Sequence, residues 1–210
     1  MVIFDLDGTL SDPAEGITGS LNHALEQLGH PTRPSSELLR YIGPPLGVAF
    51  SELMDTADRA LIERAIELYR EHYKAVGYSQ NRLYDGIPET LARLADSGLE
   101  LRIATYKRSD IAVMVAEHLG IAPLFHQIHG CDAGISKGQL LRRILPTAES
   151  TDVRSVMVGD RDSDFIAAAE AGIQSLGVAW GYGTAEELDS ATDTVGTLQH
   201  LPSAIRRILS

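Results

Sequence analysis

The stretch MVIFDLDGTLSD, residues 1–12, places two carboxylates directly after an apolar run. Met1 to Phe4 are all apolar, which is typical of a short strand buried in a parallel sheet. Asp5 and Asp7 follow, and Gly8 supplies the backbone freedom that a turn requires. The stretch therefore predicts a buried strand that ends at a candidate chemical site.

Short apolar runs and helix-like segments alternate along most of the chain. Strands are expected at residues 1–5, 100–105, 155–159 and 175–179. Helices are expected at residues 87–97, 110–119, 137–145 and 163–171. This alternation predicts an α/β protein with a Rossmann-like parallel-sheet core that carries helices on both faces.

One long segment interrupts the alternation after the first strand. Residues 13–82 show a mostly helical pattern, with helices expected at 22–28, 46–54 and 61–73. The connection is far longer than a usual loop between a strand and a helix. We therefore expect a small α-helical cap at residues 13–83, inserted into a core of residues 1–12 and 84–210. Such an insert would lie over the carboxyl ends of the strands, where open α/β sheets bind ligands.

Composition limits the classes of partner. The 210 residues carry a formal net charge of -11, which argues against a nucleic-acid polymer or an anionic membrane as partner. Cys131 is the only cysteine, so no intrachain disulfide can form. No signal peptide precedes the first strand and no apolar run approaches the ~20 residues of a spanning helix, so a cytoplasmic location is expected.

Other polar residues follow the later strands or begin the helices after them. They are Thr105, Tyr106, Lys107, Arg108, Lys137, Asp160, Asp162 and Asp164. In a parallel sheet these groups meet at one edge, where crowded carboxylates repel each other unless a cation lies between them. Mg²⁺ favours carboxylate oxygens, water and substrate phosphate, whereas lysine and threonine suit the remaining phosphoryl oxygens. The set of residues therefore predicts phosphoryl transfer.

Four motifs in this order resemble those of the haloacid dehalogenase superfamily of phosphatases. The matching stretches are DLDGT at residues 5–9, ATYK with Thr105, ISKG with Lys137, and GDRDSD with Asp160 and Asp164. The helical insert is similar to that of the group with a cap after the first motif. The chain length and the IGPPL stretch at residues 42–46 resemble the branch of phosphoglycolate phosphatases and 5'-nucleotidases.

The resemblance implies a covalent mechanism. Asp5 would be the nucleophile that forms an aspartyl-phosphate. Asp7 would protonate the leaving group and then activate the hydrolytic water. Thr105 and Lys137 would hold the phosphoryl oxygens. The expected activity is hydrolysis of a small phosphorylated metabolite, such as phosphoglycolate or a nucleotide.

The resemblance also implies a Mg²⁺ site. Its ligands would be Asp5, the backbone carbonyl of Asp7, and Asp160, with Asp164 binding through water or supporting the site from behind. Asp162 is expected to be a helix cap or a supporting group instead. Gly8 would let the backbone amides approach phosphate, and Thr9 would orient the same loop.

Several residues could set the substrate preference. Tyr106 stands where many relatives carry a small polar residue, so its ring would narrow the pocket. Lys107 could contact either the substrate or the first-motif loop. Arg40 and Gly43, in the expected cap, are candidates for substrate contact, with Arg40 suited to a carboxylate or a second phosphate.

Two other functions remain open at this point. A phosphomutase of the same fold would use the same Asp5 and Asp7 but would return the phosphoryl group to a sugar phosphate. A non-catalytic binding protein would be favoured if a motif residue were missing, and none is. The sequence does not define the oligomeric state.

Overall fold

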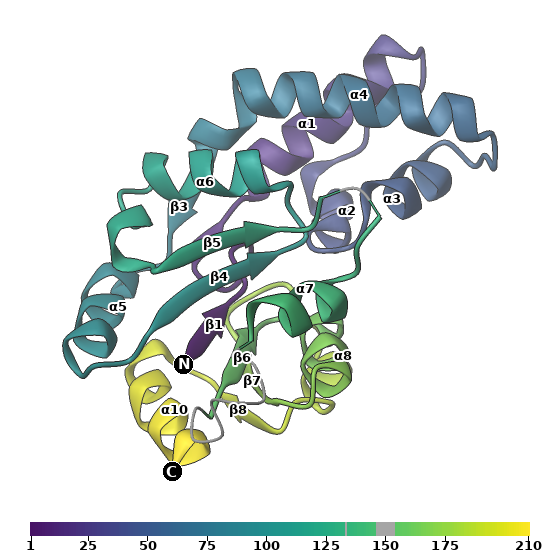
Figure 1. Cartoon of the computed structure of the whole chain (residues 1–210). Coiled ribbons are helices and arrows are strands. Elements are labelled where there is room, and N and C mark those ends of the chain that lie inside the picture. Colours follow the sequence, from purple (N-terminus) through teal and green to yellow (C-terminus); the bar gives the residue numbers. More distant parts are fainter. Residues whose placement is uncertain (133, 146–153) are drawn as a thin grey trace. The chain divides into compact units, whose positions relative to one another are not determined.

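The computed structural model describes residues 1–132, 134–145 and 154–210 (Figure 1). The described chain separates into two compact units. One consists of Met1–Asp12 and Leu83–Ser210, and the other of Pro13–Arg82.

The main sheet of the first unit has six parallel strands among the described residues, in the order β5-β4-β1-β6-β7-β8. They are β1 (Val2–Phe4), β4 (Leu101–Thr105), β5 (Gln127–Gly130), β6 (Val156–Gly159), β7 (Gln174–Val178) and β8 (Asp193–Val195). The chain adds strands on one side of β1 and then crosses to its other side. A switch point therefore lies between β1 and β6, where open α/β sheets form their ligand crevice.

The register of the central strands brings their carboxyl ends level. Phe4 of β1 pairs with Ile103 of β4 on one side and with Val158 of β6 on the other. The next amide, that of Asp5, donates to the carbonyl of Val158 at 2.8 Å. Residues that follow β1 and β6 are therefore held close together.

Helices connect the strands and cover the sheet (Figure 1). They are α5 (Ile87–Asp96), α6 (Ser109–His118), η3 (Ala122–Leu124), α7 (Lys137–Ile144), α8 (Asp162–Glu170), α9 (Ala185–Leu188), η4 (Leu198–His200) and α10 (Leu201–Leu209). Right-handed crossovers place α5 and α6 on one face of the sheet and α7 and α8 on the other. A buried apolar cluster joins the sheet to α7 and α8, and it includes Ile3, Ala104, Leu141, Met157 and Ala168.

A second sheet of two short strands lies where the chain leaves the first unit and returns to it. It pairs β2 (Ser11–Asp12) with β3 (Arg82–Leu83). The backbone amide of Tyr84 also donates to the carbonyl of Leu10 at 3.2 Å.

The second unit is helical. Its elements are α1 (Ala14–Gln27), α2 (Ser35–Leu38), η1 (Leu39–Tyr41), α3 (Leu46–Leu53), α4 (Arg59–Ala75) and η2 (Gly77–Gln80). Asp58 caps α4 by accepting from the amide of Ala60 at 2.9 Å. Buried side chains such as Leu21 of α1 and Tyr69 of α4 form its core.

The expected α/β fold with a helical insert after the first strand is confirmed, but some elements were not foreseen. Strands β5 and β8 are edge strands with exposed polar residues, so their apolar signal is weak. Helix α1 begins at Ala14 rather than at the expected residue 22, because Gly16 and Gly19 masked its helical pattern. Within the described residues, no helix is both long and apolar enough to cross a membrane.

Candidate active site

Three buried carboxylates gather at the carboxyl ends of β1 and β6. Asp5 follows β1, Asp160 follows β6, and Asp164 lies in the first turn of α8. Each offers an oxygen atom, and these atoms all lie within 4.8 Å of one another. The sheet register explains the cluster, because β1 and β6 end side by side.

The cluster is electrostatically unfavourable without a cation. Burial, together with the charges of Asp164 and Asp5, raises the pKa of Asp160 to about 8. Burial also raises the pKa of Asp164, and Lys137 counteracts that rise. A divalent cation among these oxygens would relieve the repulsion, and a donor set made only of carboxylate oxygens suits Mg²⁺. The residues present therefore fit a magnesium site.

Lys137 is the buried cation of the site. Its ammonium group donates to Asp5 Oδ1 at 2.8 Å and also to Asp164 Oδ1. Burial alone would lower the pKa of Lys137, but the carboxylates of Asp164 and Asp5 outweigh burial and hold the pKa above its usual value. Lys137 is the first residue of α7, and Ser136 fixes that position by capping the helix.

The other carboxylate of the first motif contacts a different lysine. Lys107 Nζ lies 2.6 Å from Asp7 Oδ2, and both side chains are only 10% exposed. The sequence left two roles open for Lys107, contact with the substrate or contact with the first-motif loop. In this structure Lys107 contacts the first-motif loop. Asp5 and Asp7 are therefore each paired with their own cation.

Thr105 and Tyr106 lie at the end of β4 beside this cluster. Thr105 is 2% exposed, and its hydroxyl oxygen accepts from the Lys107 amide at 3.4 Å. The Tyr106 ring centre lies 5.5 Å from Lys137 Nζ, within the range of a cation–π contact. Burial raises the pKa of Tyr106, so its phenol stays protonated at neutral pH.

Gly8 and Thr9 contact Asp160. The Thr9 hydroxyl donates to Asp160 Oδ1 at 3.1 Å. Gly8 has a φ of +80°, and a Cβ added there would lie 2.2 Å from Asp160 Oδ2. The Gly8 amide already donates to the Ser11 carbonyl at 2.8 Å. The glycine is thus required by the approach of Asp160, a reason that the sequence interpretation did not include.

Some predicted residues do not join the cluster. Asp162 is the first residue of α8 and lies outside the group of three carboxylates. Arg40 and Gly43 belong to the helical unit. There the Arg40 guanidinium pairs with Glu52 and donates to the Tyr41 hydroxyl at 2.9 Å. Their contact with substrate stays a prediction.

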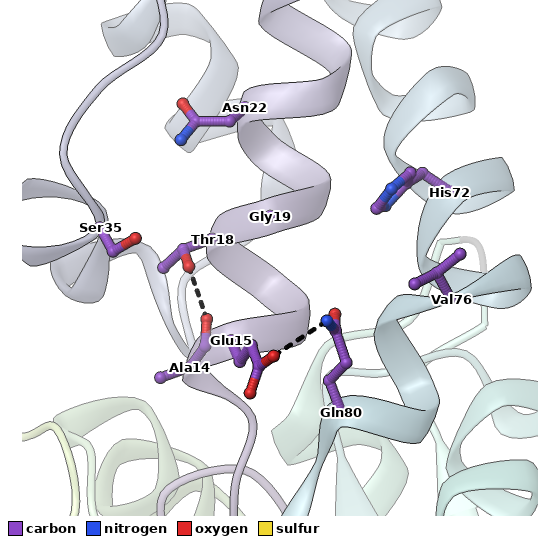
Figure 2. Close-up of a pocket in the computed structure, with 9 residues that line it drawn as sticks. All are labelled: Ala14, Glu15, Thr18, Gly19, Asn22, Ser35, His72, Val76 and Gln80. Carbon is purple, nitrogen blue, oxygen red and sulfur yellow. Dashed lines mark hydrogen bonds between the residues drawn. The ribbon is translucent and has the colours of Figure 1, made fainter.

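The helical unit contains a pocket of its own, shown in Figure 2, with a volume of about 580 Å³. It is lined by Ala14, Glu15, Thr18, Gly19, Asn22, Ser35, His72, Val76 and Gln80. None of these residues was a candidate for the site. All of them belong to the helical unit, residues 13–82.

One part of the site was missed by sequence reasoning. The stretch WGYGT, residues 180–184, was not among the candidates from the sequence. In the structure the backbone amide of Tyr182 donates to Asp160 Oδ2 at 2.8 Å. The two glycines of the stretch, Gly181 and Gly183, were the available signal, because glycine also marks a close approach of the backbone.

A parallel sheet that ends in clustered carboxylates, with a buried lysine beside them, places the protein among the α/β enzymes that act on phosphoryl groups. The chain belongs to the haloacid dehalogenase-like hydrolase family, whose model matches residues 2–178. It is a phosphatase of that family, and relatives and solved structures named as phosphatases support this assignment.

Similar proteins carry several names. A protein of Mycobacterium tuberculosis named tyrosine-protein kinase PtkA is 39% identical, over 94% of this chain and 68% of the relative. A 5'-nucleotidase of Pseudomonas aeruginosa is 36% identical, over 89% of this chain and 86% of the relative. A phosphoglycolate phosphatase of Agrobacterium fabrum is 35% identical, over 93% of this chain and 87% of the relative.

Solved structures of other proteins share the fold. The structure of a predicted phosphatase from Clostridium acetobutylicum has a TM-score of 0.88 and is 34% identical, with coverage of 98% of this chain and 97% of that chain.

Proposed function

We propose that the protein is a Mg²⁺-dependent phosphomonoesterase that hydrolyses a small phosphorylated metabolite through an aspartyl-phosphate. The observation that carries the proposal is the separate pairing of the two carboxylates of the first motif. Lys137 contacts Asp5 within the carboxylate cluster, whereas Lys107 contacts the side chain of Asp7, which is not part of that cluster. One carboxylate can then attack while the other exchanges protons.

The first half-reaction transfers the phosphoryl group to the protein. A carboxylate oxygen of Asp5 attacks phosphorus, and the bond from phosphorus to the leaving oxygen breaks. Asp7, protonated once it separates from Lys107, gives its proton to that oxygen, so the alcohol leaves neutral. Lys137 and the hydroxyl of Thr105 stabilise the charge on the phosphoryl oxygens.

The second half-reaction releases phosphate. Asp7, now a carboxylate, takes a proton from a water molecule whose oxygen attacks the phosphorus of the aspartyl-phosphate. The bond between phosphorus and Asp5 breaks, and both carboxyl groups return to their starting states. Burial of the site favours this sequence of two steps, because it keeps other water molecules away from the aspartyl-phosphate.

Asp5, Asp160 and the backbone carbonyl of Asp7 would hold Mg²⁺, with Asp164 binding through water or supporting the site. The cation would neutralise phosphate charge and orient the phosphoryl group for in-line attack. The contact with Lys137 would keep the Asp164 carboxylate ionised, which preserves the negative charge of the site.

The helical unit would act as a cap that admits small substrates and excludes large ones. The relatives named 5'-nucleotidase and phosphoglycolate phosphatase define the first substrates to test. Tyr106 would narrow the phosphate pocket, and Gly43 would shape the cap loop. Arg40 already pairs with Glu52, so a substrate carboxylate would have to displace that partner.

The test is phosphate release from phosphoglycolate, nucleoside monophosphates, sugar phosphates and pyridoxal phosphate, with Mg²⁺ and with EDTA. Wild type, Asp5→Asn and Asp96→Asn are compared, since Asp96 is an exposed aspartate on α5. We expect Mg²⁺-dependent turnover that Asp5→Asn abolishes and Asp96→Asn retains.

Other outcomes would contradict the proposal. Isomerised sugar phosphate without net phosphate release would identify a phosphomutase. Transfer of phosphate from ATP to tyrosine, without hydrolysis of any monoester, would favour the activity for which the mycobacterial relative is named. No turnover at all, with Mg²⁺ bound, would favour a binding protein.

A further inference from the structure

We propose that Tyr182 is a positioning residue for Asp160, and that the WGYGT loop, residues 180–184, orients this carboxylate before a metal ion binds. The inference rests on the proposed metal-dependent function and adds residues that no motif assigns to it. The loop follows β7, while Asp160 follows the neighbouring strand β6. It therefore reaches the carboxylate cluster from the β7 side of β6, opposite to β1.

Asp160 is held through both carboxylate oxygens. The Thr9 hydroxyl donates to Oδ1 at 3.1 Å, and the Tyr182 amide donates to Oδ2 at 2.8 Å. Two donors on different oxygens fix the rotation of the carboxylate plane. Asp160 is 1% exposed, so water does not compete for these positions.

The glycines of the loop allow its backbone to pack directly on Asp160. A Cβ added at Gly181 would lie 2.4 Å from Asp160 Oδ2 and 2.4 Å from the Gly8 carbonyl oxygen. A Cβ added at Gly183 would lie 1.8 Å from the Asp160 carbonyl oxygen. Neither glycine has a positive φ. Close approach, rather than turn conformation, is thus what requires glycine at both positions.

Side chains then anchor the loop to the segment that follows β1. The Trp180 indole donates to the Thr9 carbonyl at 3.0 Å, and the Tyr182 hydroxyl donates to Asp12. Arg161 donates to the Tyr182 carbonyl at 3.0 Å. Tyr182 therefore contacts Asp12 through its hydroxyl group and Asp160 through its backbone amide, and so links the two aspartates.

This arrangement has a consequence for metal binding. A carboxylate that is already oriented loses less freedom when it ligates a cation, so affinity rises without a new metal contact. Removing the anchor should weaken metal binding even where the fold survives. A loop that only stabilised the fold would not have this effect.

The experiment measures Mg²⁺ binding by isothermal titration calorimetry at 25 °C without substrate, and the melting temperature of each metal-free protein. The test variants are Tyr182→Phe, which keeps the amide but removes the hydroxyl contact with Asp12, and Gly181→Ala. Their matched controls are Tyr78→Phe, in the helical unit, and Gly196→Ala, where an added Cβ meets nothing within 4 Å. We expect both test variants to weaken Mg²⁺ binding about 10-fold and both controls to bind as wild type does.

Unchanged Mg²⁺ affinity in Tyr182→Phe would overturn the inference, whatever happens to its melting temperature. If Gly181→Ala does not fold, Tyr182→Phe decides alone. If wild type binds no Mg²⁺, the proposed metal-dependent function fails together with the inference. If wild type binds and the test variants bind equally well, only the inference fails.

Discussion

Asp5 and Asp7 lie one residue apart, yet their side chains contact different lysines. Lys137 approaches Asp5 from the start of α7, and Lys107 approaches Asp7 from the segment after β4. At the residue scale, these two pairings distinguish the candidate nucleophile from the candidate acid and base.

Lys137 lies between Asp5 and Asp164, and removing its charge should leave these two carboxylates to repel each other. We expect Lys137→Met to lower the free energy of unfolding of the metal-free protein by about 3–5 kcal/mol, because it leaves buried carboxylates unpaired. Urea denaturation measures this, and added Mg²⁺ should restore part of the loss. Lys74→Met, on an exposed position of α4, is the control, and an equal loss in both variants would contradict the prediction.

The single cysteine provides a pH test. Burial raises the pKa of Cys131 to about 11, so its reactive thiolate is scarce at pH 8. We expect iodoacetamide to alkylate Cys131 about 100-fold more slowly at pH 8 in the folded protein than in urea. The folded rate should rise with pH until it levels off near pH 11. A folded rate equal to the rate in urea would show that the thiol is not protected.

At the element scale, the ends of helices and the close contacts between elements determine which residue types a position tolerates. Asp162 and Asp164 occupy the first turn of α8, where negative charge suits the helix dipole. Asp164 joins the carboxylate cluster from there, whereas Asp162 does not. Helix α1 also approaches η2 so closely that one position of α1 has to be glycine.

Two glycines of α1 offer a matched comparison. A Cβ at Gly16 would lie 2.0 Å from the Gly77 carbonyl oxygen, whereas a Cβ at Gly19 meets nothing within 4 Å. We expect Gly16→Ala to destabilise the protein by about 1–3 kcal/mol through overpacking. Gly19→Ala should stabilise it by about 0.5–1 kcal/mol, because alanine suits a helix interior better. Urea denaturation measures both, and the same sign for both variants would contradict the packing described for α1.

At the scale of the whole molecule, a cation should stabilise an acidic protein whose buried carboxylates are crowded. We expect Mg²⁺ at about 100 times its dissociation constant to add about 2.7 kcal/mol to the free energy of unfolding. For a chain of this size that corresponds to a rise in melting temperature of roughly 5–10 °C. Differential scanning calorimetry with and without EDTA measures the rise.

The same measurement has matched controls. Asp160→Asn should abolish the rise, because it removes a ligand from the cluster, and Asp96→Asn should retain it. An equal rise in both variants would show that Mg²⁺ stabilises the protein through its general negative charge of -11 rather than through this site.

The sequence by itself determined the α/β class, the four central strands and the order of the candidate residues. These signals are local, because a buried parallel strand is an unbroken apolar run and each motif lies within a few residues of a strand end or helix start. Edge strands β5 and β8 gave no such signal, since their exposed residues need no apolar pattern.

Only the tertiary structure decided the pairings inside the site. The contact of Lys107 with Asp7, and that of the WGYGT loop with Asp160, join segments that follow different strands. Such contacts depend on which strands are neighbours and in which register they pair. The physical reason is that hydrophobic periodicity specifies which face of an element is buried, whereas the partner of a polar group depends on how separate elements pack together.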